Sequence, residues 1–249
     1  MKTLEEMNSW DYKTAYSFFE KNAYLNIIPE SVIYLNSLPI GTTADLRSNY
    51  ESREIILRSI SSSTLILIDG ASGNGKTTFG KRLSKFIGAE LIDIDILCIE
   101  AFNQLISKSN KKFGIKDYNY FDEYTDEYLL DNLESIIARK SESGKPVILV
   151  GLYLEPLYRA VISKTLGKYF KNIVSIFCCE KTFKKVEKML IERNKKFFSL
   201  IEGFDMNLCK AQYMKAIELI ENNNSMALGL GMDYSYVIDS TVSDLFKNV

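Results

Sequence analysis

The chain has 249 residues, of which 46% are hydrophobic, enough for one large α/β domain or one domain with an appendage. Its 31 basic and 32 acidic residues give a formal net charge of -1, so overall electrostatics favour neither nucleic acid nor an anionic membrane as a partner. No apolar run has the length of a membrane span, and the first residues lack the apolar stretch of a secretion signal. These features predict a cytoplasmic protein.

Histidine is absent, which excludes Ser-His-Asp triads, the His-Glu-x-x-His zinc helix and any imidazole general base. Acid-base chemistry therefore falls to carboxylates, lysine or tyrosine. The four cysteines include no Cys-x-x-Cys pair, and we interpret them as reduced core thiols rather than as metal ligands or disulfide partners.

The segment before Ser61 predicts a helical N-terminal appendage, residues 1–60, attached to a domain of residues 61–249. Aromatic residues at loosely helical spacing occupy residues 4–25, and a second helix is expected over residues 44–59. Aromatic stripes usually pack in a core, so we expect the appendage to pack on the main domain. An oligomerisation arm, which would allow a homodimer, and a cover over a substrate are the alternatives.

From residue 64 onward, apolar runs of strand length alternate with amphipathic segments of helix length. The expected strands are residues 64–69, 89–93, 146–151, 173–178 and 234–239. The expected helices are residues 76–87, 96–109, 125–143, 155–166, 181–196 and 208–222. This alternation predicts an α/β fold: a five-stranded parallel sheet with helices on both faces, which binds ligands beyond the carboxyl ends of its strands.

The first expected strand leads into a sequence that fits Gly-x-x-x-x-Gly-Lys-Thr, and a helix is expected to begin at Lys76. The order of strand, loop and helix is typical of a phosphate-binding loop. Its glycines let backbone N–H groups curl around a polyphosphate, and the helix adds the positive end of its dipole. A plain glycine-rich turn is the alternative. The expected nucleotide-binding residues are Gly70, Ala71, Ser72, Gly73, Asn74, Gly75, Lys76, Thr77 and Thr78.

Within this loop, Lys76 is expected to reach the β and γ phosphates of ATP, and the Thr77 hydroxyl is expected to ligate Mg2+. Asp93 and Asp95 follow at the end of the second strand. If the strand continues to Asp95, its two-residue period places both carboxylates on one side, near the loop. One can then hold a magnesium-bound water while the other accepts the proton of an acceptor hydroxyl. Helix capping by Asp95, with Asp93 solvated, is the alternative.

These motifs resemble P-loop small-molecule kinases. Residues 68–78 look like the first strand and loop of uridine-kinase-like nucleoside kinases, and residues 91–95 are similar to the Asp-x-Asp segment of shikimate-kinase-like and zeta-toxin-like enzymes. The resemblance extends loosely over residues 64–239 and implies the P-loop NTPase fold with ATP and Mg2+. It implies that Asp95 in first place, and Asp93 in second, touches the acceptor as base or metal partner.

Two further segments resemble parts of these enzymes. Residues 181–196 are similar to a lid helix that closes over the transferring phosphoryl group. Arg193 is the best catalytic candidate there, and the weaker ones are Lys188, Lys195 and Lys196. A charged surface face is the alternative for this helix. Residues 119–124 resemble an acidic, aromatic acceptor-binding segment, but their spacing differs, and a solvated turn before a helix is the expected structure.

One departure from the resemblance concerns the metal. The expected third strand, residues 146–151, ends without the acidic residue that orients Mg2+ in many of these enzymes. Glu155 follows shortly and can take this role if the turn folds back; otherwise Thr77 and Asp93 orient the metal. The departure weakens a uridine-kinase assignment more than it weakens phosphotransfer in general.

The expected function is therefore that of an ATP-dependent kinase that phosphorylates a hydroxyl of a small molecule, with a nucleoside-like acceptor favoured and with no nucleic acid or membrane as partner. A nucleotide-dependent switch or binding module, whose N-terminal segment contacts a protein, is the alternative from another class. A zeta-toxin-like nucleotide-sugar kinase is the alternative among enzymes. The sequence leaves the acceptor and the oligomeric state open.

Overall fold

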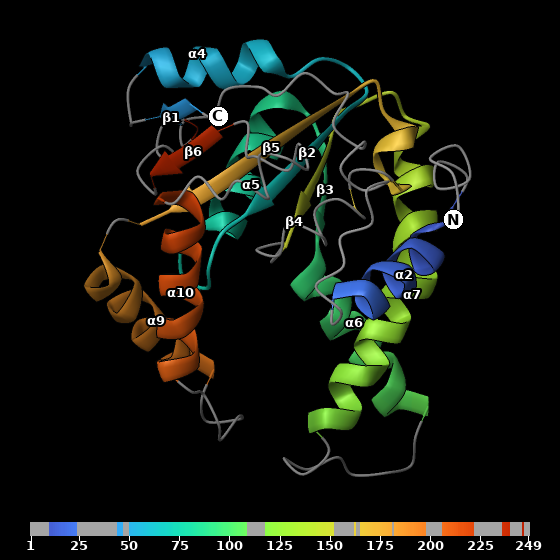
Figure 1. Cartoon of the computed structure of the whole chain (residues 1–249). Coiled ribbons are helices and arrows are strands. Elements are labelled where there is room, and N and C mark those ends of the chain that lie inside the picture. The colour runs from blue at the N-terminus through green and yellow to red at the C-terminus, as the bar shows by residue number, and fades with distance from the viewer. Residues whose placement is uncertain are drawn as a thin grey trace.

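The computed structural model describes residues 10–23, 44–46, 50–108, 118–151, 162, 165–180, 182–197, 206–221, 236–239 and 246. A six-stranded parallel sheet in the order β1-β6-β5-β2-β4-β3 forms its centre (Figure 1). The strands are β1 (Ala44–Leu46), β2 (Thr64–Asp69), β3 (Glu90–Asp93), β4 (Val147–Val150), β5 (Asn172–Cys179) and β6 (Tyr236–Asp239). Because all pairs are parallel, the carboxyl ends of the strands meet at one edge, with β2 near its middle.

The helices connect the strands and cover both faces of the sheet, which confirms the predicted α/β class. They are α2 (Tyr12–Ala23), α4 (Tyr50–Ser59), α5 (Lys76–Ile87), α6 (Ile94–Lys108), α7 (Tyr118–Ser141), α9 (Phe183–Phe197) and α10 (Met206–Glu221), with a 3-10 turn η3 (Gly167–Tyr169). None of the helices within the described ranges is long and apolar enough to cross a membrane.

Alternation along β2 divides the core into two layers. Leu65 and Leu67 pack with residues of α2 and α7, whereas Ile66 and Ile68 pack with residues of α4 and α5. All four side chains are at most 2% exposed. Each such side chain contributes roughly 1.5–3 kcal/mol by leaving water, so burial on both faces holds β2, and the loop that follows it, at the centre of the molecule.

Two expected elements differ from the structure. The helix expected over residues 44–59 is observed only at Tyr50–Ser59, because Ala44–Leu46 forms strand β1. β1 pairs with β6 in the register Ala44↔Tyr236, so the sheet has six strands rather than five. Pairing with a distant strand overrides the local helical pattern. The turn expected at residues 119–124 is also wrong, because these residues lie within α7.

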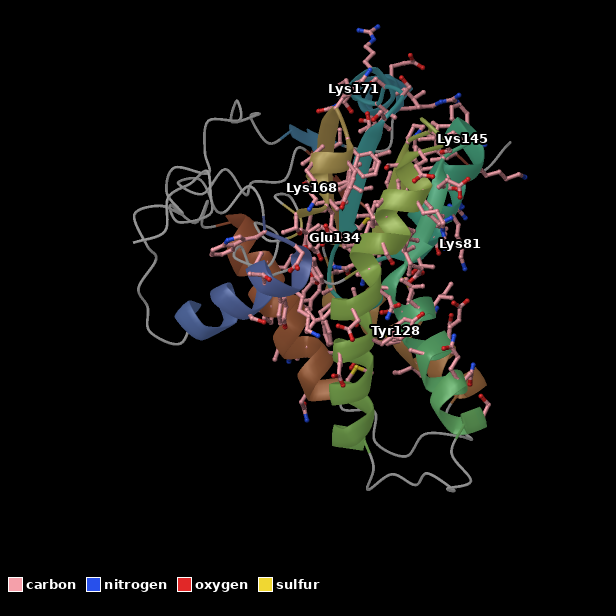
Figure 2. All side chains as sticks on the ribbon, turned by 90° about the vertical axis from the view of Figure 1, so that its right-hand side faces the viewer. Lys81, Tyr128, Glu134, Lys145, Lys168 and Lys171 are labelled. Atoms are coloured by element: carbon pink, nitrogen blue, oxygen red, sulfur yellow. The ribbon has the colours of Figure 1, made fainter. Side chains whose placement is uncertain are left out.

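A carboxylate on α7 helps to hold α2 in place. Glu134 Oε2 accepts a hydrogen bond of 2.7 Å from the Tyr12 backbone N–H, and Glu134 Oε1 accepts one of 2.8 Å from the Tyr169 hydroxyl. Lys168 Nζ lies 2.6 Å from the same Oε1, and both residues are labelled in Figure 2. Burial alone would raise the pKa of Glu134, but the three donors together hold it below its ordinary value. Helix α2 therefore packs on α7.

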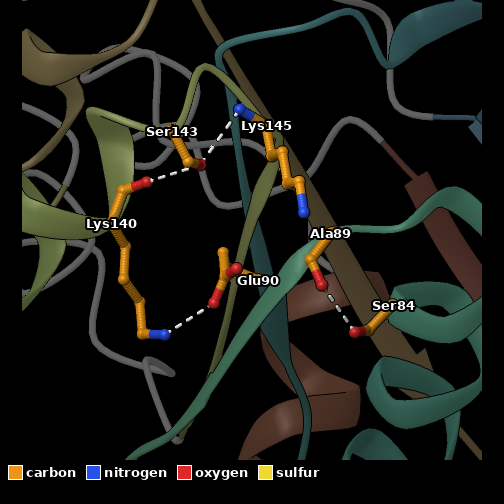
Figure 3. Close-up of polar contacts among 6 residues, drawn as sticks. All are labelled: Ser84, Ala89, Glu90, Lys140, Ser143 and Lys145. Carbon is orange, nitrogen blue, oxygen red and sulfur yellow. Dashed lines mark hydrogen bonds and ion pairs between the residues drawn. The ribbon is translucent and has the colours of Figure 1, made fainter.

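Polar contacts also close the edge of the sheet where β3 begins. Lys140 Nζ at the end of α7 lies 2.7 Å from Glu90 Oε2 at the start of β3 (Figure 3). Ser143 Oγ donates a hydrogen bond of 2.9 Å to the Lys140 carbonyl, and Ser84 Oγ donates one of 2.8 Å to the Ala89 carbonyl. These contacts fix the turns on the side opposite to the carboxyl ends of the strands.

We expect Glu134→Ala to lower the free energy of unfolding by about 1.5–3 kcal/mol, because it removes three hydrogen bonds and leaves Lys168 without its carboxylate. Urea unfolding followed by circular dichroism measures the change. The matched control is Asp131→Ala on the same helix, which breaks a half-exposed 2.6 Å ion pair with Lys13 and should leave stability nearly unchanged. Equal losses in the two variants would contradict this account of the contact between α2 and α7.

The pKa of Glu134 also predicts a pH dependence. Because its folded-state pKa lies below the ordinary value of 4.5, the ionised carboxylate stabilises the fold above the unfolded-state pKa. This contribution is lost as the pH falls through the folded-state pKa. We expect the stability of the wild-type chain to fall more steeply on acidification below about pH 5 than that of Glu134→Gln. Acid unfolding experiments in which the two proteins lose stability in parallel would contradict this contribution of Glu134.

Candidate active site

The loop between β2 and α5 curls through three glycines with positive φ: Gly70 at 142°, Gly73 at 84° and Gly75 at 84°. At Gly70 the backbone approaches β5 so closely that a Cβ would lie 2.4 Å from the Cys178 carbonyl oxygen. Both the angle and the close approach require glycine there. Close contact with β5 therefore fixes where the loop begins, and the free N–H groups of the first turn of α5 follow directly after it.

Asp69 supports the same start of the loop. This last residue of β2 is 1% exposed, and its Oδ1 accepts a hydrogen bond of 2.6 Å from the Gly70 N–H. From the sequence, Asp69 was predicted only as the last residue of the strand over residues 64–69, without a role in the loop. A carboxylate immediately before the first glycine of the loop is the signal that would have identified it.

Two polar side chains of the loop lack good hydrogen-bond partners among the described residues. Lys76 Nζ donates a long hydrogen bond of 3.4 Å to the Ala71 carbonyl. Asn74 is 1% exposed, and neither polar atom of its side chain has a hydrogen-bond partner in the described part of the chain. A buried polar group without a partner costs about 1–3 kcal/mol, so it marks a place where another polar group fits. These residues suit a loop that receives a polyphosphate.

Next to the loop, β3 ends at Asp93 and α6 begins at Ile94. The strand therefore does not continue to Asp95, and the expected placement of both carboxylates on one side of a strand is wrong. Asp93 is 6% exposed and caps α6, because its Oδ1 accepts a hydrogen bond of 3.1 Å from the Asp95 N–H. Asp95 is exposed in the first turn of α6. From the sequence, Asp95 was considered as the helix cap, but Asp93 caps α6.

A cavity of about 710 Å³ brings the loop, α6 and α9 together, a volume typical of sites for small molecules. Most of the predicted loop residues and Asp95 line it, whereas the capping Asp93 is not among its described lining residues. Gly70, Ala71 and Asn74 lie beneath this surface. The lining residues are Ser72, Gly73, Gly75, Lys76, Thr77, Thr78, Asp95, Met189, Leu190 and Glu192.

Helix α9 packs directly on the loop. A Cβ at Gly73 would lie 2.9 Å from Val186 Cγ1 and 3.1 Å from Leu190 Cγ, so glycine is needed for this contact too. The helix is tied to the end of β5, because the buried Glu180 carboxylate lies 3.2 Å from Lys185 Nζ. Glu180 was missed in the sequence, although a carboxylate directly after the fourth strand of the expected series is a usable signal. This packing brings α9 into the wall of the cavity.

Arg193 and Lys188 are two of the cationic residues of α9 that were predicted to contribute to the site. Arg193 belongs to this helix and follows the cavity-lining Met189 by four positions, but its side chain is not part of what the structure describes. Its proposed role over the transferring phosphoryl group therefore stays a prediction. Lys188 is exposed and is not among the described residues that line the cavity.

The described residues can take Mg2+ only together with a phosphate. Among the described residues, no three His, Cys, Asp or Glu side chains are grouped to hold a metal ion. β4 ends at Val150 without a carboxylate, as the sequence indicates, and Glu155 lies in a segment outside the described ranges. Thr77 lines the cavity, and Mg2+ commonly combines few protein ligands with substrate phosphates and water. Thr77 with phosphate oxygens is therefore a chemically suitable donor set.

The cysteine beneath the loop takes no part in this chemistry. Burial raises the pKa of Cys178 well above its ordinary range, although the nearby Lys76 acts in the opposite direction. The thiol stays protonated and serves as a packing group. All four cysteines are free; Cys178 and Cys179 are buried, whereas Cys98 and Cys209 are half-buried.

Comparisons with curated proteins give two relatives. The chain is 32% identical over 98 residues to tRNA dimethylallyltransferase from Hydrogenobaculum sp. (strain Y04AAS1), a match covering 36% of this chain and 33% of that protein. It is 27% identical over 172 residues to shikimate kinase from Clostridium botulinum (strain Okra / Type B1), covering 69% of this chain and 91% of that protein. The chain thus spans about a third of the first relative and most of the second. The chain resembles P-loop small-molecule kinases.

Two solved structures complete the comparison, and no protein family model matches the sequence. The PezAT chromosomal toxin-antitoxin system of Streptococcus pneumoniae aligns with a TM-score of 0.47 at 15% identity, over 76% of this chain and 74% of that chain. Shikimate kinase from Acinetobacter baumannii in complex with shikimate aligns with a TM-score of 0.40 at 13% identity, over 75% of this chain and 90% of that chain. The sheet and loop described above have the P-loop NTPase fold, and the match to a curated kinase supports phosphotransfer in general.

The close approach at Gly70 predicts a large effect of one methyl group. We expect Gly70→Ala to lower the free energy of unfolding by at least about 2 kcal/mol, because the Cβ meets a backbone oxygen in a conformation that L-residues avoid. Gly88→Ala is the control, since its φ of 67° is also positive but a Cβ there meets nothing within 4 Å. It should lose only about 1–2 kcal/mol. Urea unfolding of both variants tests this, and a smaller loss at Gly70 would contradict the contact.

Proposed function

We propose that this protein is an ATP-dependent phosphotransferase that transfers the γ-phosphate to a hydroxyl group of a small molecule. The observation that carries the proposal is that Lys76, Thr77 and the exposed Asp95 carboxylate line one cavity. The similarity to a shikimate kinase over 91% of its length supports the same class of reaction. A nucleoside is the acceptor we propose to test first, on the resemblance of residues 68–78 to nucleoside kinases.

The loop binds the nucleotide in this proposal. Its curled backbone and the N-terminus of α5 present N–H groups to the β and γ phosphates. Lys76 exchanges its long contact with the Ala71 carbonyl for a phosphate oxygen, which is the stronger, charge-assisted bond. The Thr77 hydroxyl would hold Mg2+ together with phosphate oxygens, and the ion would supply neutralisation of the charge that develops on the phosphates.

Asp95 acts as the general base. Its carboxylate accepts the proton of the acceptor hydroxyl, whose oxygen forms a bond to the γ-phosphorus. The bond from that phosphorus to the bridging oxygen breaks, and ADP leaves with the electron pair. Asp95 then returns its proton to water. The buried Asp93 positions this base, because it caps α6 through the Asp95 N–H, and we propose this role in place of a metal contact.

A nucleotide-dependent switch is the second candidate, and the missing carboxylate after β4 favours it. Tight binding of ATP without detectable transfer to nucleosides, sugars or shikimate-like acids would support the switch over the kinase. Toxicity on expression that Lys76→Ala abolishes would instead support a zeta-toxin-like nucleotide-sugar kinase.

The kinase proposal predicts that Asp95→Asn keeps ATP affinity and loses turnover by about 100-fold to 10,000-fold, the range for removal of a general base. Calorimetry measures the binding of ATP, and ADP release in the presence of an acceptor panel measures turnover. Glu100→Gln is the matched control, because this exposed carboxylate belongs to the same helix but is not among the described residues lining the cavity. It should turn over normally. Near-normal turnover of Asp95→Asn would remove Asp95 from the mechanism.

A further inference from the structure

We infer that the acceptor is a neutral or cationic hydroxyl compound with an apolar face, and that carboxylic acids are disfavoured at this site. The inference rests on the proposed function, because it concerns the part of the same cavity that the triphosphate leaves open. It is carried by the charges and the apolar surface that line the cavity beside the loop.

Two carboxylates line the cavity from different helices. Asp95 belongs to α6 and Glu192 to α9, and Figure 1 shows these helices on opposite sides of the carboxyl edge of the sheet. Among the described lining residues, Lys76 is the cation, and the proposed function assigns it to the phosphates. Among the described lining residues, the charged side chains left to face an acceptor are therefore negative. An anionic acceptor would be repelled by both, whereas a cation or a hydroxyl donor would be attracted.

The other described lining residues of α9 are apolar. Met189 and Leu190 line the cavity on the same helix, and Leu190 is held in place by its contact with the loop at Gly73. Met189 is 40% exposed, and methionine adapts readily to irregular apolar surfaces. This surface suits the carbon face of a ring whose hydroxyl or amino groups point toward Asp95 and Glu192. A nucleoside or an amino sugar has this chemistry.

The inference separates this chain from a relative named for an acid, because shikimate carries a carboxylate. A site that binds a carboxylate by charge needs a cation facing the acceptor. Among the described lining residues of α9, the charged one is Glu192, which would repel a carboxylate. Glu192 is therefore a residue that determines acceptor specificity, distinct from the base Asp95.

The first test uses sets of probes that differ mainly in charge. The full chain is loaded with Mg2+ and a non-hydrolysable ATP analogue, and calorimetry measures the affinity of each probe. The first set is glucuronate, glucose and glucosamine. The second is shikimate and its methyl ester, and the third is adenosine and its 5′-carboxylic acid. We expect the neutral or cationic member of at least one set to bind tenfold or more tightly than the anionic member. A preference of less than tenfold against the anion in every set, or the binding of no probe, would overturn the inference.

The second test changes the charge of the wall. Glu192→Gln should reduce the discrimination against the anionic probe about tenfold, and Glu192→Lys should reverse it, while the affinity for the ATP analogue changes by less than about threefold. Glu187→Gln is the matched control, because this residue lies on α9 but is not among the described residues lining the cavity. It should discriminate like the wild type. Unchanged discrimination in Glu192→Gln would overturn the role of Glu192.

Failure of the inference and failure of the proposed function give different results. If the wild-type chain does not bind the ATP analogue, the kinase proposal itself fails. If the analogue binds and the probes show no preference against negative charge, the phosphate site stands and only the acceptor class is wrong.

Discussion

The contact of Gly70 with the Cys178 carbonyl is the constraint on which the rest of the site depends. β2 is buried on both faces, so its end has little freedom, and the chain must turn within the space that β5 leaves. Gly73 then allows α9 to pack on the outer side of the same loop. The loop is thus held between a strand and a helix, and its curl precedes any ligand. A preorganised loop spends less of its binding energy on ordering the backbone.

The same loop contains the least satisfied polar groups of the site. The Asn74 side chain is buried without a hydrogen-bond partner among the described residues, and Lys76 makes only a long contact with the Ala71 carbonyl. Such groups cost stability in the folded chain, and functional sites commonly retain them because a ligand satisfies them. A rigid backbone with unsatisfied side chains is what a site for a polyphosphate requires.

The sequence predicted the parts of this structure that local chemistry determines. The apolar run of β2, the glycines of the loop and the start of α5 at Lys76 are local signals, and all three were located correctly. The end of the strand at Asp93 was located correctly, but the helix expected from residue 96 begins at Ile94, because Asp93 rather than Asp95 caps it. β1 and the cavity position of Glu192 depend on pairing or packing between distant segments, which the local pattern does not contain.

A crystal structure of the chain with Mg2+ and a non-hydrolysable ATP analogue would show whether the loop binds the triphosphate beside Asp95. We predict that Lys76 Nζ leaves the Ala71 carbonyl and contacts a phosphate oxygen. We also predict that the γ-phosphate faces the cavity lined by Asp95. Phosphates bound elsewhere, with Lys76 still directed at Ala71, would contradict it.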